Sequence, residues 1–149
     1  MTDLRELYQE VILDHTRHPR NLREMPDADR TAEGYNPLCG DRATIYLRFD
    51  GDVIQDASFV GKGCSISTAS ASMMTEALKG KTREQVERLF EKFHALVTTG
   101  PAAAEDPELG KLSVFAGVSE FPVRVKCASL AWHTMRSAMA GQAETISTE

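Results

Sequence analysis

Residues 43–59 carry the pattern that most restricts how this chain can fold. Apolar side chains alternate with polar ones, which predicts a strand with one buried face; its apolar members are Ala43, Ile45, Leu47 and Phe49. Asp50-Gly51-Asp52 follows and predicts a hairpin turn. A second strand then returns with Val53, Ala57 and Phe59 on the matching face, and Gln55 is the one misfit. The chain is therefore expected to fold around an antiparallel hairpin.

Helical patterns surround this hairpin. Apolar residues at helical spacing predict helices over residues 3–15, 65–80 and 122–139. Thr82-Arg83-Glu84-Gln85 is a capping box that opens another helix, and a short helix is expected over residues 108–116. A short strand is expected near residues 30–34, and residues 141–149 are expected to form a frayed tail. The prediction is a single α+β domain over residues 1–149, with a small antiparallel sheet of about three strands packed with helices.

Composition and charge argue against several classes of function. A chain of 149 residues is long enough to bury one ordinary core. Its net charge of −5 disfavours binding to nucleic acid or to an anionic membrane surface. The N-terminus does not resemble a signal peptide, and no apolar run approaches the roughly 20 residues of a membrane-spanning helix. We therefore expect a cytoplasmic protein that contacts neither nucleic acid nor membrane, with its three cysteines reduced.

A thiol and a carboxylate stand two residues apart in the turn formed by residues 36–41. Pro37 keeps Asn36 out of the helical region, and Gly40 permits a sharp bend. Cys39 and Asp41 could therefore point at one common object, and a thiolate beside a carboxylate suggests a metal cation.

Two further cysteines could complete such a site. Pairing across the hairpin brings Cys39 to within about one residue of Cys64, which lies just before the first turn of a predicted helix. Cys127 lies near the start of the last predicted helix. Together with Asp41 these thiols make four ligands, which is the coordination number that zinc prefers.

The residues alone leave a second interpretation open. Free cysteine also serves as a small buried hydrophobic residue, and Cys127 falls on the apolar stripe of its helix. No Cys-x-x-Cys pair is present to strengthen the metal hypothesis. If a metal site exists, zinc fits best among the common metals. His15 and His18 end the first helix, and either could approach the site.

Four ordered segments of the sequence resemble the IscU/NifU-type iron–sulfur cluster assembly proteins, and the match covers nearly the whole chain. The opening of the chain is similar to that family over residues 8–15, with Pro19 and Asn21 following. The three segments that resemble the ligand segments of the family are Asn36-Pro37-Leu38-Cys39-Gly40-Asp41, Gly61-Lys62-Gly63-Cys64 and Arg124-Val125-Lys126-Cys127-Ala128. The resemblance implies an IscU-like fold.

Within that family the chain most resembles the SufU branch. The scaffold proteins of the family place His immediately before the third cysteine, where this chain has Lys126, and an extra stretch spans residues 97–121. Resemblance to SufU implies a zinc-dependent sulfurtransferase that takes persulfide sulfur from a cysteine desulfurase of the SufS type. It would pass that sulfur to downstream proteins of iron–sulfur cluster assembly.

The same resemblance implies roles for single residues. Cys39, Asp41, Cys64 and Cys127 would bind Zn²⁺, and Cys39 would be the catalytic sulfur acceptor, uncaged when a ligand from the desulfurase displaces it from the metal. One rival is a non-catalytic IscU-type scaffold that carries a transient iron–sulfur cluster, and Lys126 argues against it. A second rival is a purely structural zinc, but such sites usually hold only Cys and His, and Asp41 argues against it.

Overall fold

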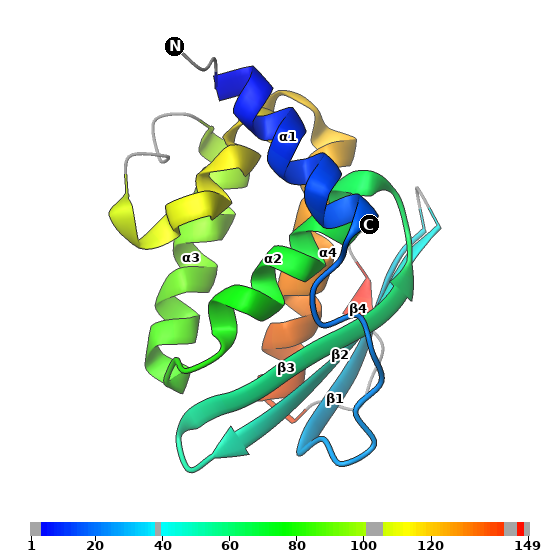
Figure 1. The fold of residues 1–149 in the computed structure, drawn as a ribbon, viewed down its shortest axis with the longest axis vertical. Coiled ribbons are helices and arrows are strands. Elements are labelled where there is room, and N and C mark those ends of the chain that lie inside the picture. Colours follow the sequence, from blue (N-terminus) through cyan, green and yellow to red (C-terminus); the bar gives the residue numbers. More distant parts are fainter. Residues whose placement is uncertain (1–3, 38–39, 101–105, 142–145, 148–149) are drawn as a thin grey trace.

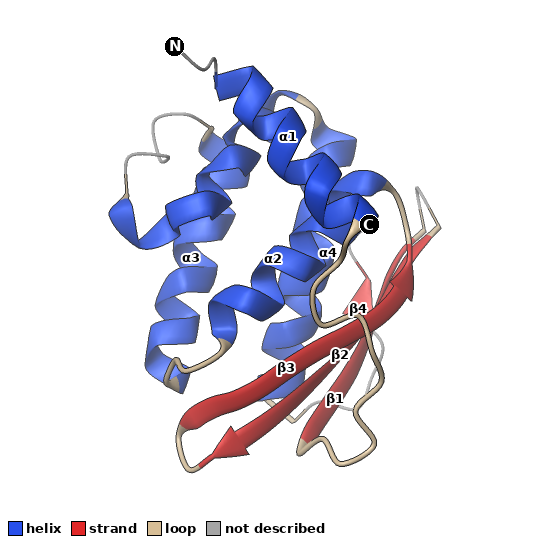
Figure 2. Ribbon diagram, viewed as in Figure 1, coloured by secondary structure: helices blue, strands red, loops and turns tan. Residues whose placement is uncertain are grey.

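The computed structural model describes residues 4–37, 40–100, 106–141 and 146–147, and it has the predicted α+β architecture. A sheet lies at one side of the molecule and the helices lie against it (Figures 1 and 2). In chain order the elements are α1 (Leu4–Arg17), β1 (Arg30–Asn36), β2 (Asp41–Asp50), β3 (Val53–Lys62), α2 (Ser65–Leu78), α3 (Arg83–Thr99), the 3₁₀ helix η2 (Pro107–Glu120), α4 (Pro122–Met139) and β4 (Ile146–Ser147).

The sheet has the order β3-β2-β1-β4. β1, β2 and β3 are antiparallel neighbours, which confirms the three-stranded sheet that the sequence predicts. β4 adds two residues parallel to β1, with Ile146 opposite Gly34. The prediction that the chain frays from Gly141 is therefore wrong for residues 146–147. Alternation cannot reveal so short a strand, because its backbone pairs with an edge that forms only in the folded sheet.

A bulge in β3 makes the inward-facing residues of the hairpin differ from those predicted. The register passes from Arg48 opposite Asp56 to Phe49 opposite Ile54, which leaves Gln55 as an extra residue. The bulge turns Ile54 into the core, where it is fully buried, and leaves Val53 only half-buried. The prediction that Val53 faces the core is wrong for this reason, and Gln55 was a misfit because it is the inserted residue.

The helices bury the inner face of the sheet. α4 packs on β1 and β2, whereas α2 packs on β3. Trp132 of α4 is buried among them: its ring stacks on Phe93 of α3 with centroids 4.4 Å apart, and its Nε1 donates to Ser70 Oγ of α2 over 3.2 Å. Ser70 Oγ in turn donates to Ala128 O of α4 over 2.6 Å. These contacts fix α4, and with it Cys127, against the start of α2.

Local signals predict most helix ends correctly. Thr82 and Gln85 form both bonds of the capping box at the start of α3, and α4 begins at Pro122. The segment expected as a helix over residues 108–116 is instead 3₁₀ over Pro107–Glu120 and breaks at Gly110, whose φ is 52°. No helix in the described part of the chain is long and apolar enough to cross a membrane.

Candidate metal centre

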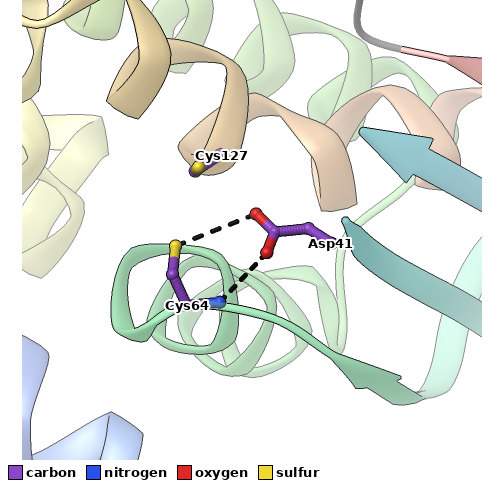
Figure 3. Close-up of side chains that lie close together, drawn as sticks. All are labelled: Asp41, Cys64 and Cys127. Carbon is purple, nitrogen blue, oxygen red and sulfur yellow. Dashed lines mark hydrogen bonds between the residues drawn. The ribbon is translucent and has the colours of Figure 1, made fainter. Parts of the chain in front are cut away.

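Asp41 is the first residue of β2, and its buried carboxylate lies against the start of α2. Its Oδ1 accepts the backbone N–H of Cys64 over 3.1 Å, and its Oδ2 lies 3.8 Å from Cys64 Sγ. Only 2% of the residue is exposed. Because one oxygen is held by a backbone donor, the other is aimed at the space between the sulfur atoms (Figure 3).

Cys64 is the N-cap residue of α2. Its Sγ accepts the backbone N–H of Ser67 over 3.4 Å, where the helix dipole favours negative charge. A hydrogen bond with Cys127 and the N–H of Ser67 lower the pKa of the Cys64 thiol to about 6, although burial and the Asp41 carboxylate act against this shift. The sequence expectation that Cys64 precedes the first turn of a helix is confirmed.

Cys127 comes from the second turn of α4 and is 3% exposed. Its Sγ lies 4.0 Å from Nδ2 of Asn36, a fully buried residue at the end of β1. The backbone oxygen of Asn36 also accepts the N–H of Gly40 over 2.8 Å, which closes the turn leading into β2. Asn36 therefore connects this turn to α4.

The carboxylate of Asp41 and the sulfurs of Cys64 and Cys127 converge from three separate elements, as Figure 3 shows. One ligand atom from each lies within 4.8 Å of the others. Zinc binds thiolate sulfur at about 2.3 Å and carboxylate oxygen at about 2.0–2.2 Å, so tetrahedral ligand atoms stand about 3.3–3.8 Å apart. The three atoms need only a small contraction to reach that geometry. This donor set fits zinc, because it joins soft sulfur and one carboxylate around a single point.

Gly63 leaves the space that the Asp41 carboxylate occupies. A Cβ atom at this position would lie 2.9 Å from Asp41 Oδ1 and 3.1 Å from Ser67 Cβ, closer than side chains tolerate. A side chain at this position would therefore crowd the Asp41 carboxylate. The sequence placed Asn36 and Gly63 in segments that resemble ligand segments but did not predict their contacts with Cys127 and Asp41, because these contacts depend on how β2 and α4 pack against α2.

The other residues considered from the sequence lie elsewhere or outside the described part. Cys39 is outside the described residues. His15 is buried against Ser72 and His18 is exposed, and neither belongs to the group of ligand atoms found among the described residues. The guanidinium of Arg124 covers the ring of Phe121 at 4.4 Å, and both residues are exposed.

Comparison with known proteins finds one family model and several named relatives that match most of this chain. The model of the NifU-like N-terminal domain matches residues 7–128. The zinc-dependent sulfurtransferase SufU of Bacillus subtilis (strain 168) is 41% identical over 138 residues, covering 93% of this chain and 92% of that protein. The iron–sulfur cluster assembly scaffold protein IscU of Streptococcus pyogenes serotype M1 is 39% identical and covers 93% of this chain and 86% of that protein.

Solved structures agree on the fold. A candidate iron–sulfur cluster assembly scaffold protein for the SUF system, FiSufU from Fervidobacterium islandicum AW-1, superposes with a TM-score of 0.82. It is 34% identical, and the match covers 89% of this chain and 96% of that one.

Proposed function

Because the chain belongs to the family of the NifU-like N-terminal domain, we propose that it is a zinc-dependent sulfurtransferase of iron–sulfur cluster assembly. It accepts persulfide sulfur from a cysteine desulfurase of the SufS type in the cytoplasm and passes that sulfur to downstream assembly proteins. The observation that carries this proposal is the convergence of one carboxylate and two thiols, from Asp41, Cys64 and Cys127, within 4.8 Å.

Four residues bind the metal in this proposal, and one of them, Cys39, is also the sulfur acceptor. Asp41, Cys64, Cys127 and Cys39 would hold the metal, and zinc would keep their thiolates deprotonated near neutral pH without redox chemistry of its own. Cys127 is buried within a helix, and the sulfur of the exposed Cys64 caps α2 by accepting the N–H of Ser67. Cys39 precedes Gly40, whose φ is 73° and around which an added Cβ would meet nothing within 4 Å. This supports Cys39 as the sulfur acceptor.

The transfer itself balances without an added oxidant. The Cys39 thiolate attacks the outer sulfur of the desulfurase persulfide, a new S–S bond forms on Cys39, and the desulfurase cysteine leaves as a thiolate. The persulfide on Cys39 then gives its outer sulfur to an acceptor thiolate by the same exchange. Each step forms one sulfur–sulfur bond and breaks another.

An assembly scaffold is the second candidate, since a relative 39% identical to this chain bears that name. Lys126 disfavours it. The position immediately before the third cysteine is where the scaffold proteins carry a histidine, and an ammonium group cannot serve as a ligand while it is protonated. With Lys126 there, the available set is three thiols and one carboxylate, which suits zinc better than a cluster.

One experiment separates the two candidates. Protein purified without oxygen is analysed for zinc and iron, and is then mixed with a SufS-type desulfurase, cysteine and an alkylating reagent before mass spectrometry. We expect about one zinc per chain, an added sulfur on Cys39, and faster desulfurase turnover. Cys39→Ser should abolish the added sulfur and the faster turnover.

Three results of this experiment would contradict the sulfurtransferase proposal. A stoichiometric iron–sulfur chromophore in place of zinc would favour the scaffold. Zinc without any effect on desulfurase turnover would indicate a structural metal. A persulfide found on Cys64 or Cys127 would contradict the role proposed for Cys39.

A further inference from the structure

A second polar site lies away from the metal centre, where α1, α2, α3 and η2 meet. A pocket with a volume of about 220 Å³ opens between these helices. α2 contributes to both places: Cys64 caps its first turn, whereas Met73, Glu76 and Ala77 in its second half line the pocket. None of the residues assigned to the metal lines this pocket.

One wall of the pocket is apolar and belongs to the core. Its side chains come from α2, α3 and η2, and all but Ala77 are at most 4% exposed: Met73, Ala77, Leu89, Leu109 and Leu112. A volume of 220 Å³ corresponds to about seven water molecules. The pocket therefore suits a small ligand with an apolar part, of fewer than about ten non-hydrogen atoms.

The rim of the pocket carries charges of both signs. It is formed by His15, Glu76, Lys81, Glu108 and Lys111. Lys81 and Lys111 form no ion pair with any residue that the structure describes. Glu108 is already engaged by Lys92 Nζ at 3.1 Å and by Arg88 Nη1 at 3.7 Å. Glu76 is half-exposed, and its nearest cationic or ring nitrogen is His15 Nε2 at 3.6 Å.

Among the described residues, His15 is the one lining residue of the pocket that comes from α1, and its ring is held by Ser72. Ser72 Oγ accepts the N–H of Arg20 over 2.8 Å and forms a second hydrogen bond with His15 Nδ1 over 2.7 Å. Burial lowers the pKa of His15 and nearby Arg20 lowers it further, so the ring is neutral near pH 7.

From the two uncommitted lysines, the half-exposed Glu76 and the apolar wall, we propose that this pocket binds a free α-amino acid with an apolar side chain. The carboxylate of the ligand lies with Lys111 and Lys81, its ammonium group with Glu76, and its side chain on the wall formed by Leu89, Leu109 and Leu112. A simple carboxylate would leave Glu76 without a cation, and a simple amine would leave the two lysines without an anion. A zwitterion satisfies both charges at once.

Three probes of matched shape test this proposal on the full-length zinc-loaded protein. L-Leucine, 4-methylpentanoate and 3-methylbutylamine share one branched side chain and differ in their charged groups. Binding is followed by backbone amide shifts at Leu89, Leu109 and Leu112 in ¹H–¹⁵N spectra. Leucine should bind on the order of tenfold more tightly than either other probe, because each of them lacks one charge-assisted contact.

Surface variants provide the second arm. Lys111→Met and Glu76→Gln should each weaken leucine binding on the order of tenfold. Both side chains are exposed, so the variants should fold. Lys62→Met is the matched control: this exposed lysine at the end of β3 does not line the pocket, and its removal should leave leucine affinity unchanged.

Several results would overturn the proposal. Absence of amide shifts at tens of millimolar leucine would exclude binding of this class. Equal affinity for all three probes would mean that the pocket recognises only apolar shape. If Lys62→Met weakened leucine binding as much as Lys111→Met, the effect would be one of net charge. Because no metal ligand lines the pocket, each result stands apart from the outcome of the sulfur-transfer assay.

Discussion

The first turn of α2 and its middle both carry buried polar groups, but they differ in how those groups are paired. In the middle, Ser72 Oγ bonds His15 Nδ1 at 2.7 Å and the N–H of Arg20 at 2.8 Å, so these groups are well satisfied within the protein. At the start, Asp41 Oδ1 accepts the N–H of Cys64 over 3.1 Å, but the contact between the candidate ligand atoms is longer, with Asp41 Oδ2 lying 3.8 Å from Cys64 Sγ.

This difference distinguishes a cluster that stabilises the fold, in the middle of α2, from a candidate metal site at the start of α2. Buried polar groups at short hydrogen-bond distances stabilise the packing of α1 on α2. Polar atoms that converge at distances too long for strong bonds have room for a further atom between them. Burial alone would have marked both places equally, since His15 and Asp41 are 3% and 2% exposed.

Removing a sulfur ligand should have the largest effect. Cys127→Ala is expected to weaken zinc binding by more than about 100-fold, beyond the 10–100-fold typical of residues that only support ligands. Asp41→Ala should cost less, because a carboxylate is more easily replaced by water. Chelator competition measures both affinities, with Ser129→Ala on the same helix as control. A Cys127→Ala protein with parental affinity would show that the sulfur is not a ligand.

Crowding the carboxylate should have the next largest effect. Gly63→Ala places a Cβ 2.9 Å from Asp41 Oδ1, so we expect zinc affinity to fall about tenfold. Gly117→Ala is the matched control, because an added Cβ there meets nothing within 4 Å and its φ is not positive. If the two variants bind zinc equally, the space at Gly63 does not position Asp41.

Breaking the satisfied cluster should affect stability instead. Ser72→Ala leaves His15 Nδ1 and the N–H of Arg20 without their partner, at a cost of about 1–3 kcal/mol for each unsatisfied group. Urea unfolding of the metal-free protein measures the loss. Zinc affinity of the folded variant should stay at the parental value, and a parallel fall in zinc affinity would mean that the two clusters are not independent.

A third polar group, on α4, should make stability depend on pH. Burial, then His94 and Arg136, lower the pKa of His133, whose ring lies 5.3 Å from that of Phe90. The unfolded chain therefore takes up protons near pH 6.5 while folded His133 stays neutral, and stability falls as pH drops from about 6.5 towards the folded pKa. His133→Phe should make the urea midpoint of the metal-free protein fall less between pH 7.5 and 5.5. An unchanged slope would remove His133 as a cause.

The smallest effect is expected at Ser58, whose buried Oγ has no hydrogen-bond partner among the described residues. Ser58→Ala should be neutral or should stabilise the protein by up to about 1 kcal/mol, since no bond is lost. Ser70→Ala is the contrasting control, because Ser70 Oγ bonds Ala128 O and Trp132 Nε1. Thermal unfolding should rank Ser58→Ala above the parent or level with it, and Ser70→Ala below.

Features that depend on residues close together in the sequence could be predicted from the sequence alone. The hairpin, the capping box at Thr82 and the start of α4 at Pro122 follow from local backbone preferences and periodic burial, and all three are present. The order of the ligand motifs also indicated the family. The position of Cys64 at a helix start is local as well, so its role as the cap of α2 could be anticipated.

Only the tertiary structure determined the features that join distant parts of the sequence, because these features depend on long-range packing. Cys127 reaches Asp41 and Cys64 through the packing of α4 on the sheet, whereas its place on an apolar helix stripe, taken alone, favoured a role in the core. The bulge that exchanges Val53 for Ile54 depends on how β3 pairs with β2, and β4 forms only where β1 offers an edge. The contact between Gly63 and Asp41 likewise joins residues of two elements whose distance no local pattern encodes.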